Sequence, residues 1–98
     1  MTLPVKLRRA ARAEFDEAHD WYEAKRTGLG EQFSDRVQEA LDRIALTPEM
    51  HQCIYKDVRR QIVRGFPYSV LYRVKSDKIL VIAVFHAKRD PAIWQRRA

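Results

Sequence analysis

The spacing of apolar residues changes once along this chain of 98 residues, and the change limits the possible folds. Up to about residue 46, apolar side chains recur every three or four residues, which is the period of an amphipathic helix. From residue 58 onward they mostly alternate with polar residues, which is the period of a strand. A chain of this length fits one domain. We therefore expect a single domain over residues 1–98, of the α+β class, with helices before most of the sheet.

Two helices are expected first. One covers residues 10–26, and its apolar face is formed by Ala11, Phe15, Ala18 and Tyr22, with Trp21 at the edge. Acidic residues of the same segment, Glu14 and Glu17 among them, are expected to face solvent. The other helix covers residues 31–46 and ends before Pro48, because proline disfavours helical backbone in the residue before it. The short connection predicts an antiparallel helical hairpin.

A short strand at residues 5–8 precedes the helices, and three strands follow them, at residues 58–63, 68–75 and 79–85. The last strand is almost wholly apolar, which predicts a central strand buried on both faces. Short turns predict an antiparallel meander, and the helical hairpin is the only cover for its apolar face. The expected architecture is βααβββ, with an N-terminal helical hairpin packed on an antiparallel sheet. Residues from Asp90 onward are expected to form a turn and a loose basic tail.

Charge divides the chain into two unlike halves. Residues 50–98 carry 11 Lys and Arg against 3 Asp and Glu, a net charge of +8, whereas residues 1–49 have a net charge of −2. A basic half of this kind is typical of proteins that bind nucleic acid or an acidic protein. The alternative is a solvated basic surface that binds no ligand.

Composition argues against several classes of site. The single cysteine, Cys53, cannot form an internal disulfide, which favours a reducing cytoplasm. One cysteine and scattered histidines argue against a metal site. The glycine spacing matches neither common phosphate-binding motif, so we expect no cofactor. No apolar run reaches the roughly 20 residues needed to cross a bilayer, and the first residues lack the apolar core of a secretory signal, so no membrane association is expected.

One group of basic and aromatic residues remains as a candidate site. In an antiparallel meander, the ends of the strands at 58–63 and 79–85 both lie near the start of the strand at 68–75. We therefore expect Arg64, Tyr68 and the segment from His86 to Arg89 to meet at one end of the sheet. The candidate residues for binding a phosphate or a target are Arg59, Arg60, Arg64, Tyr68, Tyr72, Arg73, Lys88 and Trp94, and the candidate catalytic residues are His86 and Arg89.

Two chemistries fit such a group. Arginines can clamp a phosphodiester while His86 or a tyrosine transfers protons, or the group can recognise acidic side chains of a protein. Structural roles compete with both, since Tyr68 and Tyr72 share a strand face with valines and Trp94 suits a lid on the sheet. Arg89 and Arg64 are expected to lie close together with no carboxylate partner except Asp90.

Several segments, in their order and spacing, resemble a known superfamily. They are residues 10–18, 20–22, 33–37, 46–48, 59–61, 66–74 and 81–91, followed by Trp94. Across nearly the whole chain they resemble the RelE/ParE superfamily of bacterial type II toxin–antitoxin toxins. The resemblance implies two helices packed on an antiparallel sheet, which agrees with the architecture expected from the hydrophobic pattern.

The superfamily contains two activities. RelE-like members cleave mRNA in the ribosomal A site through attack of a 2′-hydroxyl on the neighbouring phosphate, and Arg60, Arg64 and Arg89 match their basic positions. Two features depart from that set: Ser69 stands where an arginine often follows the strand tyrosine, and Trp94 lies near the position of a missing C-terminal tyrosine. An indole has no proton to transfer near neutral pH.

The segment from His86 to Pro91 is more similar to ParE-type members, which poison DNA gyrase and have no accepted nuclease site. The resemblance therefore favours a ParE-like toxin that inhibits growth by binding a protein target. The alternative is a RelE-like mRNA endoribonuclease, and a second alternative is a non-toxic, degenerate binding module.

The resemblance also implies partners. Family toxins are neutralised by a cognate antitoxin whose C-terminal segment covers the toxin, and the +8 half would attract an acidic segment of this kind. The target is either DNA gyrase or the ribosome with its mRNA. Binding to promoter DNA is expected only through the antitoxin, and the location is expected to be cytoplasmic.

Overall fold

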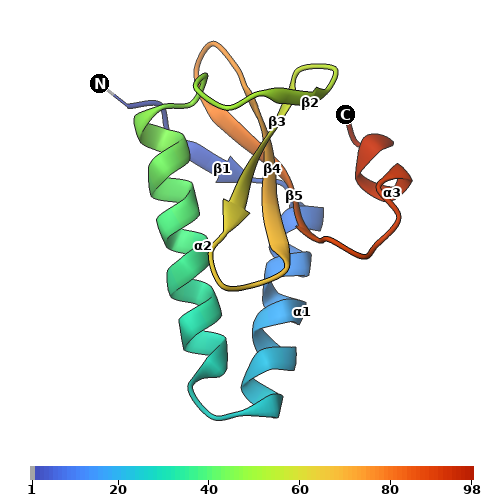
Figure 1. The fold of residues 1–98 in the computed structure, drawn as a ribbon. Helices are drawn as coiled ribbons and strands as arrows, with labels where there is room; N and C mark the ends of the chain where they lie inside the picture. The colour runs from blue at the N-terminus through green and yellow to red at the C-terminus, as the bar shows by residue number, and fades with distance from the viewer. Residues whose placement is uncertain (1) are drawn as a thin grey trace.

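The computed structural model describes residues 2–98 (Figure 1). Its elements in chain order are β1 (Val5–Leu7), α1 (Arg9–Lys25), α2 (Leu29–Leu46), β2 (Cys53–Tyr55), β3 (Val58–Val63), β4 (Tyr68–Val74), β5 (Ile79–His86) and α3 (Ala92–Gln95). The helical hairpin and the strands expected before and after it are all present. Two short elements, β2 and α3, add to the predicted set.

The sheet has five strands in the order β1-β5-β4-β3-β2. Strands β3, β4 and β5 form the expected antiparallel meander. Strand β1 pairs with β5 in parallel, so the complete sheet is mixed. The edge is fixed at both ends of β1, where Ile79 N–H donates to the Pro4 carbonyl and Arg8 N–H donates to the Val81 carbonyl, each at 2.9 Å.

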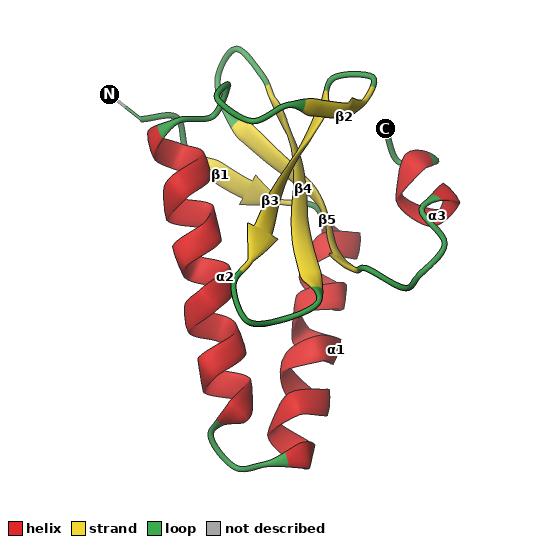
Figure 2. Ribbon diagram, viewed as in Figure 1, coloured by secondary structure: helices red, strands yellow, loops and turns green. Residues whose placement is uncertain are grey.

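Helices α1 and α2 lie side by side and cover one face of the sheet, whereas α3 lies on the opposite side (Figure 2). Alternate residues of β4 turn toward the hairpin, where Val70 and Tyr72 are buried with Phe33 and Ile44 of α2. Tyr68 and Val74 pack at the margins of the same cluster. The predicted strand face of tyrosines and valines is therefore the face that packs on the helices.

A bulge in β5 distributes its apolar run between the two faces. Leu71 pairs with Ala83 and Tyr72 pairs with Val81, which leaves Ile82 as an extra residue. Ile82 and Ala83 both join the cluster on the α3 side, and that cluster includes Trp94, only 6% exposed. The strand is buried on both faces, as expected. The prediction of a loose tail is wrong, because Trp94 has a large apolar surface that α3 packs on the sheet.

The helical hairpin depends on a close approach at Gly30. A Cβ built there would lie 2.8 Å from the His19 carbonyl oxygen and 2.9 Å from a carboxylate oxygen of Glu23. Glu23 also accepts hydrogen bonds from the backbone N–H groups of Gly28 and Gly30. Small residues are required where a backbone carbonyl is this near.

We expect Gly30→Ala to lower the free energy of unfolding by about 1–3 kcal/mol, because the two helices must separate to admit the methyl group. Urea denaturation followed by circular dichroism measures the change. Thr27→Ala, an exposed position in the same connection, is the control and is expected to change stability by no more than about 0.5 kcal/mol. Equal stability of the Gly30 variant and the control would contradict the packing described.

Candidate functional site

Three segments distant in sequence meet at one end of the sheet, as the meander predicts. Val63 pairs with Tyr68, and Tyr68 pairs with His86 on the other side. The turn after β3 and the segment after β5 are therefore neighbours, and Ala87 N–H donates to the Pro67 carbonyl at 2.8 Å. The backbone convergence on which the candidate site depends is present.

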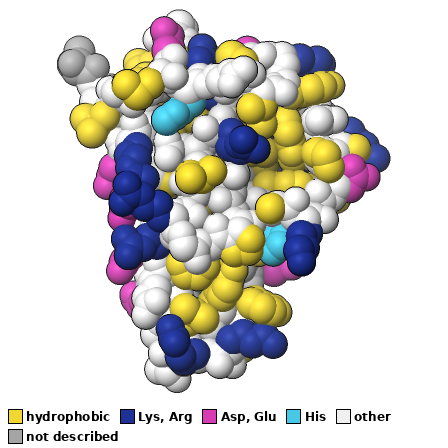
Figure 3. Space-filling model, in the orientation of Figure 1, with side chains coloured by type: hydrophobic (Ala, Val, Ile, Leu, Met, Phe, Trp, Pro, Cys, Tyr) yellow, Lys and Arg dark blue, Asp and Glu magenta, His cyan; other side chains and the backbone are white. Residues whose placement is uncertain are grey.

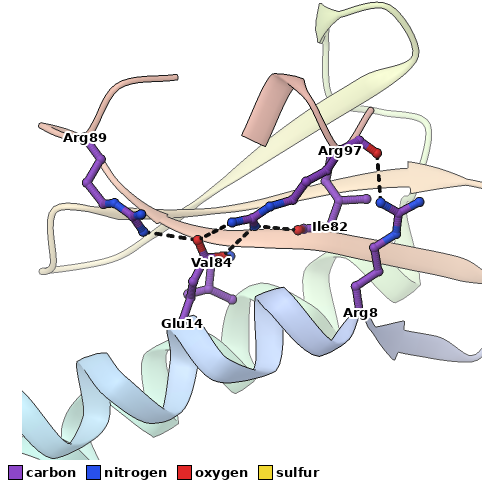
Figure 4. A network of polar contacts seen from close by, with 6 residues as sticks. All are labelled: Arg8, Glu14, Ile82, Val84, Arg89 and Arg97. Atoms are coloured by element: carbon purple, nitrogen blue, oxygen red, sulfur yellow. Dashed lines mark hydrogen bonds and ion pairs between the residues drawn. The ribbon is translucent and has the colours of Figure 1, made fainter. Parts of the chain in front are cut away.

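The carboxylate of Glu14 is the centre of a polar network at this end of α1 (Figure 4). It accepts a hydrogen bond from Val84 N–H at 3.1 Å and two from the guanidinium of Arg97, each at 3.0 Å. Arg89 donates to the same carboxylate at 3.2 Å. The Glu14 side chain is only 11% exposed, so the expectation that it faces solvent is wrong. One carboxylate thus ties α1 to β5 and to two C-terminal arginines.

The network also holds the C-terminal residues against the domain. Arg97 donates a further hydrogen bond to the Ile82 carbonyl at 3.0 Å, and Arg8 donates to the Arg97 carbonyl at 2.8 Å. Both contacts are visible in Figure 4. Hydrogen bonds to a charged group contribute more than neutral ones, so these contacts stabilise the position of the chain end.

A groove of about 780 Å³ lies beside this network. Its walls are one side of α1 and the ends of β4 and β5, and its lining residues include Ala10, Ala13, Glu17, Trp21, Tyr22, Tyr68 and His86. The Tyr68 ring lies 6.2 Å from the Tyr22 ring and 5.0 Å from the His86 ring, edge to face in both cases. The His86 Nδ1 accepts a hydrogen bond from Lys88 N–H at 3.0 Å. The groove is therefore lined by aromatic rings together with two carboxylates and two guanidinium groups, those of Glu14, Glu17, Arg89 and Arg97.

The guanidinium groups do not gather into one cationic pocket. Arg64 lies beside α2, 3.7 Å from the carboxylate of Glu39, in a separate hollow with Arg36 and Phe66. The expectation that Arg64 joins Tyr68 and Arg89 is therefore wrong, although its backbone lies near theirs. The expectation that Asp90 is the carboxylate partner of Arg64 and Arg89 is also wrong, because the Asp90 carboxylate accepts a hydrogen bond from Ala92 N–H instead. Figure 3 shows Lys and Arg side chains spread over the visible face.

The other candidate arginines lie on different parts of the sheet. Arg59 donates to the backbone carbonyls of Glu49 and His51, and Arg73 forms an ion pair with Asp57 at 2.7 Å. Arg60 is exposed. Arg59 and Arg73 are used in separate local contacts, and Arg60 lies on the sheet face that α3 covers, so the three do not form a shared phosphate clamp with Arg89.

Two aromatic candidates and one lysine also lie outside the groove. Tyr72 is fully buried, and its hydroxyl donates to the Pro48 carbonyl at 2.9 Å. Trp94 packs edge-on against Tyr55 and covers the sheet from the α3 side. Lys88 is exposed beyond the end of β5. Of the candidate residues named from the sequence, only Tyr68, His86 and Arg89 line the same groove.

Burial raises the pKa of three tyrosine hydroxyls above the ordinary value, those of Tyr22, Tyr68 and Tyr72. For Tyr68 the neighbouring Tyr22 and the charge of Glu17 add to the effect of burial. A raised pKa in the folded state means that folding favours the protonated form. The contribution of these buried tyrosines to the free energy of unfolding is complete below pH 10, the ordinary tyrosine pKa. It is lost as the pH rises through their higher pKa values in the folded state.

We therefore expect the absorbance increase that accompanies ionisation of these tyrosines to occur at a higher pH than for free tyrosine. Stability is expected to fall over the same pH range. Spectrophotometric titration in parallel with thermal unfolding measures both effects. Tyr72→Phe removes one buried hydroxyl and is expected to remove one late-titrating group. Titration of all tyrosines at the ordinary pKa would contradict the burial described.

Among residues 2–98, no group of three His, Cys, Asp or Glu side chains is placed to hold a metal ion. No helix in this part of the chain is long and apolar enough to cross a membrane.

Comparison with known proteins identifies the family. Residues 5–91 match the family model described as the ParE toxin of the type II toxin–antitoxin system, parDE. This chain belongs to the ParE toxin family. A solved structure described as the chromosomal ParDE TA system from P. aeruginosa matches with a TM-score of 0.66 and 19% sequence identity, covering 89% of this chain and 98% of that one. At this identity the match shows a shared fold. No curated protein matches the chain significantly.

In this ParE-family chain, the most connected polar residue of the site is one that the sequence did not indicate. Glu14 lies between Ala11 and Ala18, the two buried alanines of α1, and so occupies the face of the helix that packs on β5. Glu14 is three positions from Ala11 and four from Ala18, and residues at these spacings share a helix face. This spacing is the one sequence feature that indicates a buried position for Glu14. Arg97 carried no signal, because it lies in a segment too short for a periodic pattern.

Proposed function

We propose that this ParE-family chain is a toxin that inhibits bacterial growth by binding a protein target, with DNA gyrase as the target. Membership of the ParE family, from a match to residues 5–91, carries the proposal. The expected cationic pocket does not contribute to it, because the arginines are dispersed. The proposed location is the cytoplasm, where such a target is found.

The separation of Arg60 from His86 favours binding over mRNA cleavage, although Arg89 lines the same groove as His86. Cleavage by a 2′-hydroxyl needs a proton-transfer group and phosphate-binding cations within reach of the same bond. Arg60 lies opposite Leu71, on the sheet face that α3 covers, whereas His86 lies opposite Tyr68, on the face that α1 and α2 cover. Residues paired across strands share a face, so the two groups cannot act on one phosphate.

A cognate antitoxin is the proposed neutralising partner. Residues 50–98 have a net charge of +8, and long-range attraction increases the rate at which an acidic segment encounters such a surface. Promoter DNA is bound through the antitoxin in this proposal. A short acidic or DNA-binding protein encoded beside this one is the candidate antitoxin.

The proposal is tested by controlled expression in a bacterium. Growth arrest on induction, relieved by co-expression of the neighbouring candidate antitoxin, is the expected result. An SOS response with intact mRNA is expected during the arrest. Unimpaired growth would contradict both toxic functions and favour a non-toxic binding module, and codon-phased cuts in primer extension would favour the ribonuclease.

Arg89→Ala is expected to lower toxicity several-fold, measured as the inducer concentration that halves the growth rate. The guanidinium is nearly half exposed at the mouth of the groove, 4.8 Å above the Phe85 ring, where a partner can reach it. The Glu14 carboxylate keeps Arg97 as its partner when Arg89 is removed, so the variant should remain folded. Lys88→Ala is the control for loss of one adjacent charge. Full toxicity of a folded Arg89 variant would remove Arg89 from the functional surface.

A further inference from the structure

The outer edge of β3 is only partly occupied. Strand β2 is three residues long, and its register covers Val58 and Arg59 but not the segment from Arg60 to Val63 (Figure 2). In the sheet formed by residues 2–98, no strand other than β2 lies beyond β3. An unpaired strand edge presents backbone donors and acceptors with which another extended chain can pair.

The hydrogen bonds of the neighbouring ladder determine which backbone groups point to this open edge. Ala87 N–H donates to the Pro67 carbonyl, so the next residue, Tyr68, directs its own backbone groups away from β5 and toward its partner Val63 on β3. This direction alternates along an antiparallel strand. The N–H and C=O groups of Ile62 therefore point away from β4, to the open edge.

Ile62 is accessible at this edge through both its side chain and its backbone. The side chain is 58% exposed, on the same sheet face as Arg60 two residues earlier. The Nε2 atom of Gln61 lies 3.5 Å from the Ile62 carbonyl oxygen, whereas N–H to oxygen hydrogen bonds usually measure about 2.7–3.2 Å. The N–H of an added strand can therefore form a shorter bond to this carbonyl.

Cations outnumber carboxylates beside the open edge. Arg60 is exposed and forms no ion pair with any of residues 2–98. Arg64 is 65% exposed and lies 3.7 Å from Glu39, a carboxylate that already has two arginines of α2 as partners, at 2.9 and 2.7 Å. Asp35 lines the hollow next to Arg64. Four arginines against these two carboxylates leave a net charge of +2.

The same charges argue against a second copy of this chain at the edge. If two β3 strands paired in antiparallel about Ile62, Arg60 of one copy would meet Arg64 of the other. Like charges placed opposite each other across two strands are destabilising. An acidic segment instead brings a carboxylate to each of these arginines.

We propose that the open edge of β3 binds an acidic, extended segment of a partner protein, which joins the sheet as an antiparallel strand. The segment places an apolar side chain next to Ile62 and an acidic side chain toward each of Arg60 and Arg64. Backbone hydrogen bonds hold the added strand, and the net charge of +2 selects an acidic sequence. The inference concerns this edge alone and does not depend on toxicity or on the gyrase target.

The test uses the purified, ¹⁵N-labelled full chain and the capped peptide Thr-Glu-Thr-Val-Thr-Glu-Thr. Because the Ile62 N–H points to the open edge, its hydrogen exchange reports directly on strand addition. We expect this exchange to slow by about tenfold at a peptide concentration of about ten times the dissociation constant. Replacing both glutamates of the peptide with glutamine keeps the side-chain shape, removes the charge, and is expected to weaken binding by about threefold or more.

A second pair of peptides tests the geometry of the added strand. N-methylation of the valine removes the donor to the Ile62 carbonyl and is expected to weaken binding by about tenfold. N-methylation of the threonine immediately before the valine is the matched control, because that N–H points away from β3 and its loss is expected to have little effect.

Two matched variants of the chain assign the charge effect. Arg60→Gln is expected to reduce the preference for the glutamate peptide, whereas Arg26→Gln, the same charge change at an exposed position after α1, is expected to keep it. Any of four results would overturn the proposal: absence of saturation at about 10 mM, unchanged exchange of the Ile62 N–H at saturation, equal affinity for the glutamate and glutamine peptides, or equal effects of the two N-methyl groups. Slower exchange of this N–H on raising the concentration of the free chain would assign the edge to a second copy instead.

Discussion

Glu14→Gln is expected to lower the free energy of unfolding by about 3 kcal/mol, which is the cost of breaking a largely buried ion pair by removing one partner. The amide can still accept from Val84 N–H, so the backbone contact to β5 is kept. The guanidinium of Arg97 loses its carboxylate while remaining mostly buried, and Arg89 loses its partner as well. Urea denaturation followed by circular dichroism measures the loss.

The same variant is expected to loosen the C-terminal residues selectively. Hydrogen exchange should increase from α3 to the chain end more than in α2, because Arg97 links that segment to α1 and to the Ile82 carbonyl. Asp16→Asn is the matched control, since it breaks an exposed ion pair with Arg12 on the same helix and should cost no more than about 0.5 kcal/mol. Equal losses in the two variants would show that Glu14 has no special role.

Phe33→Ala is expected to cost about 4 kcal/mol, within the range measured for removing a buried phenylalanine. Phe33 is fully buried and lies at the centre of an aromatic cluster, with Phe15, Tyr22, Phe66 and Tyr68 ring centroids between 5.1 and 5.8 Å from its own. The cavity left by alanine would separate α1 from the ends of the strands. A domain with a total stability of about 5–15 kcal/mol would become marginal.

Thermal and urea unfolding of the Phe33 variant measure this effect, with Ile62→Ala as the control. Ile62 is an equally apolar but 58% exposed position on β3, and its truncation should change stability by less than about 1 kcal/mol. Tyr68 and Tyr22 pack on Phe33, so the groove should also change in the variant. A loss of less than about 1 kcal/mol for Phe33→Ala would contradict the packing of the hairpin.

The hydrophobic period was sufficient to predict the helical hairpin and the meander. Residues such as Phe33 and Val70 recur at spacings that only one type of element can bury. The period carried no information on β2 or α3, because the three residues of β2 show no apolar–polar alternation and the four residues of α3 are too few to show a helical repeat. The period also gave no indication of the bulge at Ile82. A bulge is visible in a sequence only as a break in apolar–polar alternation, and this strand is apolar throughout.

The candidate site was predicted less completely, and side-chain direction is the reason. Strand order placed Arg64 near Tyr68 correctly along the backbone, but the side chain turns toward α2 and its Glu39. Glu14 was assigned to solvent because its partners, Arg89 and Arg97, lie 75 and 83 residues further along the chain. No local pattern connects positions so far apart, so contacts of this kind require the tertiary structure.

The proposed target of this ParE-family chain is DNA gyrase. A supercoiling assay with purified gyrase, relaxed plasmid and the purified chain tests this target. Supercoiling activity is expected to fall as the chain is added and to recover when the cognate antitoxin is included. Undiminished supercoiling in the presence of a chain that still arrests growth in cells would contradict it.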